Sequence, residues 1–403
     1  MFKINVYFFT IVILVVFFNK YVNSQKSNIN EFIDNNSVFA LKLYREIASI
    51  EGNSFVFSPF SIQITGGLLY LGANETTSKL LQDCFNFKLS AKDIGNLFQN
   101  ILKKYQYDDS LKIANGIFIA EELEIARGFS NDAKRKFNST IKNIQFSDIK
   151  SATKRINRFV RRNTNGKIRQ LLSPDALDPQ TIMLLINAIS FQAEWKEKFL
   201  PMLTQKDKFY STSTKIIEVD TMYGFKRSYK LGTNQEKNYI VAEIGFIETD
   251  ISFQIIIPSK LNLNIDHIEN LFTKSGLNNI IEDAQIRKVE GQVQIPKFLG
   301  KTDIDLKLIL SRLGMTNLFS NEADFSKFLK MNEPLSISKA VHKAYIDIHE
   351  NGAEAAAATG YELEYRIANG NMRSFVANQS FIYLLKGSKG EIYFMGRYTG
   401  VYK

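Results

Sequence analysis

The chain has 403 residues, a formal net charge of +10 and one cysteine; 45% of its residues are hydrophobic and 23% are charged. These proportions are typical of a globular protein. A single cysteine excludes an intrachain disulfide framework, so the fold has to depend on its core. Because no Pro-, Gly- or Ser-rich linker and no internal repeat divides the sequence, we expect one domain over residues 25–403.

Residues 1–24 have the pattern of a secretory signal peptide. Lys3 precedes an apolar run from Ile4 to Phe18, and Val22-Asn23-Ser24 places compact residues before Gln25. This run is too short and wrongly flanked for a membrane span, and no other apolar stretch is longer. We therefore expect a secreted, extracellular protein with no membrane partner.

Glycosylation sequons agree with secretion. Candidate acceptors are Asn35, Asn74 and Asn138. A fourth sequon, at Asn378, leads directly into an apolar strand beginning at Phe381, which makes it the least favourable of the four.

Helical patterns dominate the first part of the chain. Ser37 can cap a helix beginning at Val38, and another helix follows Ser58-Pro59, with proline in its first turn. Further helical patterns occur at Thr77–Leu81, Ile94–Lys104 and Ser151–Arg162. Strand-like apolar runs occur at Lys112–Ala120, Ile182–Phe191, Tyr239–Phe246, Ile251–Pro258, Gln292–Pro296, Phe381–Leu385 and Glu391–Met395. Early helices followed by many strands indicate an α+β protein.

Positive charge is densest between Lys150 and Arg169. A helix there would bury Ile156 and Val160 and place five cations on its outer face: Lys154, Arg155, Arg158, Arg161 and Arg162. This face is either a solvated helix surface or a binding site for a polyanion such as a heparin-like glycosaminoglycan. Nucleic acid is not an expected partner, because interleaved aromatic stacking residues are missing.

Residues 339–366 predict a β-hairpin around Asn351-Gly352, since Asn-Gly favours a two-residue type I′ turn. The first strand has an apolar face formed by Ala340, His342, Ala344, Ile346 and Ile348. The turn would set Ile348 opposite Ala355 and Ala340 opposite Leu363. Residues 355–358 are all alanine, a strong helix former and a poor strand former. Such a conflict often marks a segment with more than one state.

The segment from Glu350 to Thr359 closely resembles the hinge of the reactive-centre loop in serpins, the serine protease inhibitors. Other segments resemble serpin motifs in the same order along the chain: Asn53–Ile62, Leu71–Ala73, Ile156–Ile168, Asn187–Phe199 and Phe394–Arg397. The resemblance covers most of the chain. It implies a monomer with the serpin fold, a bundle of about nine helices around three β-sheets. An exposed reactive-centre loop would occupy about residues 350–374.

The resemblance also implies a mechanism. A protease cleaves the loop, forms an acyl-enzyme and is inactivated when the freed loop inserts into the central sheet. The hinge residues would be Glu350, Gly352, Ala353, Ala355, Ala357 and Thr359. Their small side chains suit entry into a sheet.

Residues outside the loop would control opening of that sheet. The resemblance places His342 beside Asn187, Ser58 and Ser61, in the region called the shutter. It places Trp195 at the top of the sheet, in the region called the breach, and pairs Lys297 with Glu350.

The family's loop length places the scissile bond fourteen positions after Gly352, at Arg366-Ile367. Arginine there suits a trypsin-like protease, whose specificity pocket holds a carboxylate. A shift of one position would make Tyr365 the bait and predict a chymotrypsin-like target.

Enzyme chemistry has no supporting motif. The chain has three histidines, and we find no nucleophile elbow, phosphate-binding loop or His-Glu-x-x-His motif. Cys84 lacks the context of a nucleophile and is expected to be buried and inert. We expect no catalytic residues, no metal and no cofactor.

The sequence therefore predicts a secreted serine protease inhibitor that acts as a suicide substrate and forms a covalent complex with a trypsin-like protease. The alternative is a non-inhibitory serpin that acts as a binding, carrier or storage protein.

Overall fold

The computed structural model describes residues 28–105, 109–331, 335–350 and 373–402. The predicted signal peptide at 1–24 lies outside these ranges. So do the predicted loop residues Gly352, Ala353, Ala355, Ala357 and Thr359, and the predicted reactive bond Arg366-Ile367.

Within these ranges the chain contains nine α-helices. The first spans residues 28–50; the others are α2 (Pro59–Gly72), α3 (Glu75–Cys84), α4 (Ala91–Lys104), α5 (Arg127–Phe137), α6 (Ile149–Asn163), α7 (Asp266–Ser275), α8 (Leu277–Asp283) and α9 (Leu306–Leu310). Short helical turns lie at Pro174–Ala176, Pro201–Leu203, Ser311–Met315, Thr316–Phe319 and Ser326–Phe328.

The described strands are β1 (Phe55–Phe57), β2 (Leu111–Ala120), β3 (Thr140–Ile144), β4 (Met183–Phe191), β5 (Gln205–Tyr210), β6 (Ile216–Asn234), β7 (Tyr239–Gly245), β8 (Ser252–Pro258), β9 (Arg287–Pro296), β10 (Phe298–Asp305), β11 (Lys339–Ile348), β12 (Arg373–Val376), β13 (Phe381–Lys386) and β14 (Ile392–Tyr398). The mixture and order of these elements confirm the predicted α+β class.

A five-stranded sheet has the order β10-β11-β4-β2-β3. Its central strand, β4, is buried at every position, which explains its uninterrupted apolar sequence. β4 runs antiparallel to β2 but parallel to β11, over eight residue pairs from Lys339 with Leu184 to Ile346 with Phe191. We call this five-stranded sheet the central sheet.

The other strands form one hydrogen-bonded sheet, in the order β1-β14-β13-β8-β7-β6-β9-β12, with β5 added beside β6. The long strand β6 joins two parts of it. Its register with β9 shifts between Gly224 and Arg227, and Lys226 takes a positive φ of 49° at that bulge. The hydrogen bonds of the described strands thus form two sheets, where the resemblance implied three.

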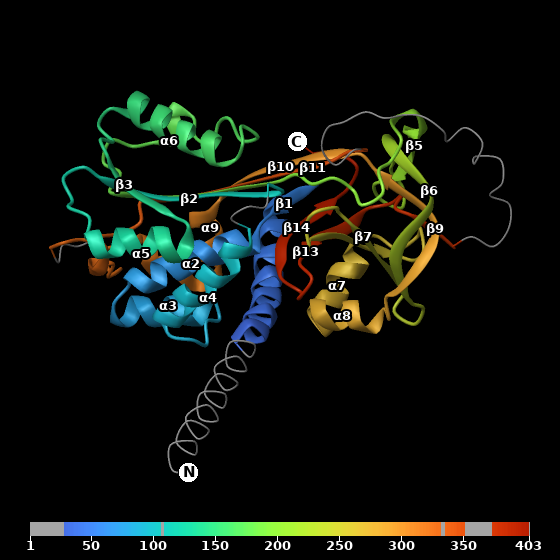
Figure 1. The fold of residues 1–403 in the computed structure, drawn as a ribbon, viewed down its shortest axis with the longest axis horizontal. Coiled ribbons are helices and arrows are strands. Elements are labelled where there is room, and N and C mark those ends of the chain that lie inside the picture. The colour runs from blue at the N-terminus through green and yellow to red at the C-terminus, as the bar shows by residue number, and fades with distance from the viewer. Residues whose placement is uncertain (1–27, 106–108, 332–334, 351–372, 403) are drawn as a thin grey trace, which may run out of the picture.

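Helices cover both faces of the central sheet. In Figure 1, α6 lies on one side of β2 and β3, and α2, α4 and α5 lie on the other. Successive residues of β4 accordingly point into two separate cores: Leu185 and Ile189 join the main core, whereas Leu184 and Ile186 join the smaller core under α6.

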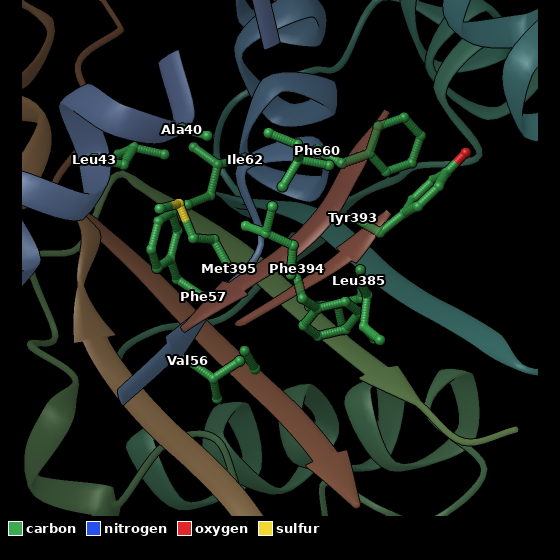
Figure 2. Packing of buried hydrophobic residues seen from close by; sticks show 14 of the residues in the cluster. Ala40, Leu43, Val56, Phe57, Phe60, Ile62, Leu385, Tyr393, Phe394 and Met395 are labelled. Carbon is green, nitrogen blue, oxygen red and sulfur yellow. The ribbon is translucent and has the colours of Figure 1, made fainter. Parts of the chain in front are cut away.

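The main core passes continuously between helices and both sheets. Figure 2 shows Phe60 and Ile62 of α2 packed over Tyr393, Phe394 and Met395 of β14. The Phe60 and Tyr393 ring centroids are 4.8 Å apart in an edge-to-face arrangement. The main core therefore holds helices and strands of both sheets together.

One predicted helix start was wrong. The first helix spans residues 28–50, so it begins well before Val38 and holds Ser37 in its interior. Ser37 is buried there, next to the buried Phe39 and Asn36. Packing of Phe32 in the main core, edge-on to Phe60 and Phe98, supports the additional turns.

The predicted hairpin pairing was also wrong for the described structure. Its first strand is β11, and the predicted inner face from Ala340 to Ile348 is buried. However, both edges of β11 already have partners, because Ile348 pairs with Phe298 of β10 and Ala340 pairs with Leu185 of β4. Another strand could pair with β11 only after β4 or β10 had moved away.

Candidate functional site

A buried polar cluster connects the central sheet to helix α2. The strand registers place Asn115 of β2, Asn187 of β4 and His342 of β11 in one row across the sheet. Ser58 lies at the N-cap of α2, where its side chain accepts a hydrogen bond from the Ser61 backbone N–H. Proline at the next position suits the first turn of this helix. The sequence-predicted shutter residues are therefore brought together.

His342 connects β11 to both partners in this cluster. The Ser58 backbone N–H donates to His342 Nε2 at 3.1 Å, so Nδ1 carries the proton of the neutral ring. Nδ1 then donates to Asn187 Oδ1. Complete burial lowers the pKa of His342 to about 3, although its contact with Asn187 acts in the opposite direction. The ring is therefore neutral at physiological pH.

Asn187 is the centre of the cluster. Its Nδ2 lies 2.7 Å from Ser61 O, 2.8 Å from Ser61 Oγ, 2.8 Å from Asn115 Oδ1 and 3.0 Å from Thr65 Oγ1. These contacts tie β4 to α2 at the same level at which His342 ties β11 to α2. Separation of β4 from β11 must therefore break or rearrange buried hydrogen bonds.

Glu350 forms a second contact centre, just beyond the end of β11. Its carboxylate accepts from Lys297 Nζ at 2.9 Å and from Thr204 Oγ1 at 2.8 Å. Partial burial raises the pKa of the Glu350 carboxyl, but the hydrogen bonds from Lys297 and Thr204 outweigh it, and the net pKa lies below its ordinary value. The predicted pair of Lys297 and Glu350 is present.

Trp195 joins the segment after β4 to the end of β11. Its Nε1–H donates to the His349 backbone carbonyl at 2.7 Å. The indole is buried and stacks on Phe246, with ring centroids 4.4 Å apart. Phe199, four residues later, donates its backbone N–H to the Glu350 carbonyl at 3.0 Å. The end of β11 is thus held by the segment that follows β4.

Several contact residues were not predicted. Thr65 lies four residues after Ser61 on α2, so helical spacing could have identified it. Asn115 is a lone amide within an apolar strand, which is a weak signal for a buried polar role. Thr204 and Arg227 carry no local signal, since only tertiary structure brings their elements to this end of the sheet.

The predicted basic face of α6 is exposed. Lys154, Arg155, Arg158, Arg161 and Arg162 all face solvent, whereas Ile156 and Val160 are buried. No ion pair involves these five cations in the part of the chain that the structure describes. Arg162 also lines a groove of about 510 Å³ between α4, α5, α6 and β2, together with Lys103, Lys112, Lys134 and Arg135.

The candidate glycosylation sites differ in accessibility. Asn138 is exposed at the end of α5. Asn35 lies within the first helix and its Oδ1 accepts from Asn86, and Asn74 Nδ2 donates to Ser326 Oγ. Asn138 therefore offers the most accessible amide of the three.

Cys84 is half-buried at the end of α3, and burial raises the pKa of its thiol. Among the described residues, no group of three His, Cys, Asp or Glu side chains is arranged to hold a metal ion. None of the helices in the described ranges has the length and apolar character needed to cross a bilayer.

Comparison with known proteins agrees with this geometry. The family model described as Serpin (serine protease inhibitor) matches residues 34–400. Antichymotrypsin-2 of Bombyx mori is 31% identical over 90% of this chain and 96% of its own length. The crystal structure of Serpin48 from Tenebrio molitor covers 92% of this chain and 98% of its own, at 27% identity and a TM-score of 0.81.

A structure of native protease nexin-1 with heparin covers 92% of this chain and 99% of its own, at 26% identity and a TM-score of 0.81. The fold, the buried cluster and the family match all point to one class of protein. The chain belongs to the serpin family. Members of this family are generally inhibitors of proteases and not enzymes.

Proposed function

We propose that this serpin is an inhibitor of trypsin-like serine proteases that acts once, by inserting its cleaved loop between β4 and β11. The observation that carries this proposal is the direct parallel pairing of these two strands. A segment that turned back after Glu350 would run antiparallel to β11 and therefore also antiparallel to β4. Its insertion would replace one parallel ladder by two antiparallel ladders, which are slightly more stable per residue.

The energetics favour insertion once the loop is free. A strand of about 13 residues would form about a dozen ladder hydrogen bonds, each contributing about 0.5–1.5 kcal/mol net. Their sum is comparable to the whole stability of a typical domain, about 5–15 kcal/mol. The uncleaved protein must then be kinetically trapped. The contacts of His342, Asn187 and Glu350 supply suitable barriers, because they hold β4 and β11 together.

The protease would be stopped during its own reaction. Cleavage forms an acyl-enzyme, and insertion carries the attached protease along the central sheet. Distortion of its active site prevents deacylation, because loss of a single oxyanion-hole donor already costs about 10²–10³ in rate. Arg366 as the bait supports a trypsin-like target, because its guanidinium matches a carboxylate in the specificity pocket.

Incubation with trypsin tests this function. We expect an SDS-stable covalent complex, together with a released peptide whose first residue is Ile367. An Arg366→Ala variant should lose the complex with trypsin, whereas the neighbouring Tyr365→Ala variant should keep it. Cleavage at Arg366 without any stable complex would refute the inhibitory function, and a complex that depends on Tyr365 instead would move the bait by one position.

The non-inhibitory alternative predicts a different response to heat. After cleavage of the loop by a non-target protease, an inhibitor gains a strand and should melt at a much higher temperature. A binding or storage protein should melt at nearly the same temperature before and after cleavage.

Secretion is part of the same proposal. It rests on the apolar run from Ile4 to Phe18 and is supported by the exposed sequon at Asn138. We further propose that a heparin-like glycosaminoglycan binds the outer face of α6. One support is the row of five exposed cations and the adjoining cationic groove. The other is the structural similarity to protease nexin-1, whose structure was solved with heparin.

A further inference from the structure

Arg227 occupies an unusual position in this fold. It follows the bulge of β6, and only 4% of its surface is exposed. Burial lowers the pKa of its guanidinium to about 10, against an ordinary value of 12.5, with Glu197 acting in the opposite direction. A charge this deeply buried needs compensating contacts.

Those contacts go to the segment that follows β4. Nη1 donates to the Lys198 carbonyl at 3.1 Å, and Nη2 donates to the Glu197 carbonyl. The guanidinium lies 3.9 Å from the centroid of the Phe199 ring, a cation–π contact. Arg227 therefore fixes three consecutive residues, two through their backbone and one through its ring.

The same segment holds the end of β11. Phe199 donates its backbone N–H to the Glu350 carbonyl at 3.0 Å, and its ring meets Trp195 edge-on at 5.7 Å. Trp195 in turn binds the His349 carbonyl. The Phe199 ring thus lies between the indole of Trp195 and the guanidinium of Arg227, and its backbone contacts the residue at which the predicted loop begins.

Gly224 makes room for this arrangement. A Cβ at this position would lie 2.0 Å from Arg227 Cδ, so any side chain here would displace the arginine. The bulge between Gly224 and Arg227 turns the arginine toward the segment after β4.

We propose that Arg227 is a positioning residue for sheet opening, which holds residues 197–199 as a latch on Glu350 and slows the separation of β4 from β11. This inference rests on the proposed insertion mechanism. It assigns a role to a strand outside the central sheet. β6 pairs with neither β4 nor β11, yet it would restrain their separation.

Hydrogen exchange of the intact protein tests the latch directly. We compare wild type with Arg227→Met, Arg227→Lys and Gly224→Ala, and use Lys230→Met as the control, because Lys230 is an exposed cation on the same strand. In Arg227→Met, amides of residues 196–199 and 346–350 should exchange about 10- to 100-fold faster, because two charge-assisted hydrogen bonds are lost. Gly224→Ala should behave similarly, Arg227→Lys should be intermediate and Lys230→Met should match wild type.

Peptide uptake supplies the second readout. A synthetic peptide with the sequence of residues 353–366 should enter the sheet of Arg227→Met faster than that of wild type. Each of Arg227→Met and Lys297→Met should raise the rate of peptide uptake by some factor. The double variant should raise this rate by less than the product of the two factors, because both side chains act on Glu350.

Unchanged exchange at 346–350 in Arg227→Met would overturn the latch, as would multiplicative effects of the two substitutions on uptake. A wild-type protein that takes up no peptide would contradict the proposed insertion mechanism instead. The exchange measurement would still decide whether Arg227 holds Glu350.

Discussion

His342 illustrates how one side chain can hold two strands and a helix together. It is fully buried, its ring is neutral, and both ring nitrogens have partners, one on α2 and one on β4. The apolar face that periodicity predicted for β11 contained this histidine, but periodicity could not identify its partners. The strand register decided them, because it aligns His342 with Asn187.

We expect His342 to make the native protein less stable in acid. Its pKa is about 3 in the folded state and 6.5 ordinarily. Between these values the unfolded chain binds a proton that the folded chain does not, so the free energy of unfolding falls as the pH falls. The contribution is about 1.4 kcal/mol per pH unit.

Urea unfolding from pH 6.5 to pH 4.5 measures this effect. The His342→Asn variant should be less stable than wild type at pH 7 but should lose less stability on acidification. His349→Asn, at a half-exposed position, is the control and should retain the wild-type slope. Equal slopes in wild type and His342→Asn would show that His342 is not the titrating group.

At the scale of elements, the inner face of β11 constrains what can be inserted beside it. Ile346 and Ile348 are buried in the main core, whereas Asp347 on the other face is half-buried. A strand paired with β11 around an Asn351-Gly352 turn would set Ala355 opposite Ile348 and Ala356 opposite Asp347. Neighbouring alanines in the loop sequence would therefore enter very different surroundings.

A pair of substitutions tests this register. Ala355→Arg should place a charge in the core and reduce the yield of SDS-stable complex with trypsin about tenfold or more, since an unpaired buried charge costs several kcal/mol. Ala356→Arg adds the same side chain but faces Asp347, and it should retain the wild-type yield. Similar yields from both variants would contradict the alternation of faces in the inserted strand.

At the scale of the whole molecule, the net charge of +10 includes a cluster of five cations on α6. Helix α6 lies at the outside of the molecule, next to β2 and β3 (Figure 1). Its five cations are exposed and form no ion pair within the described ranges. Such a patch attracts polyanions and raises association rates by about 10- to 1,000-fold at low salt. The gain falls as ionic strength rises.

We therefore expect heparin to accelerate trypsin inhibition and salt to reduce the acceleration. A triple substitution of Arg155, Arg158 and Arg162 to Glu should abolish it. The control replaces three exposed cations outside α6, Lys260, Lys274 and Lys288, by Glu and changes the net charge equally. If both triple variants lose the acceleration to the same extent, overall charge and not the α6 face is responsible.

Local sequence determined most elements of this protein because each depends on short-range patterns. Serine followed by proline begins α2, alternating residues form the inner face of β11, and an unbroken apolar run forms β4. The reactive-centre loop and its alanine-rich hinge were inferred from motifs and stay predictions, because residues 351–372 lie outside the described ranges. The first helix was placed too late, because packing of Phe32 extends it beyond its local signal.

Only the tertiary structure decided which strands lie next to one another. The sequence suggested that β11 pairs with the residues that follow it, whereas its partners are β4 and β10. Strand order depends on contacts between distant segments, and local patterns carry little information about them. The same reason hid Arg227, because the latch exists only where the bulge of β6 meets the segment after β4.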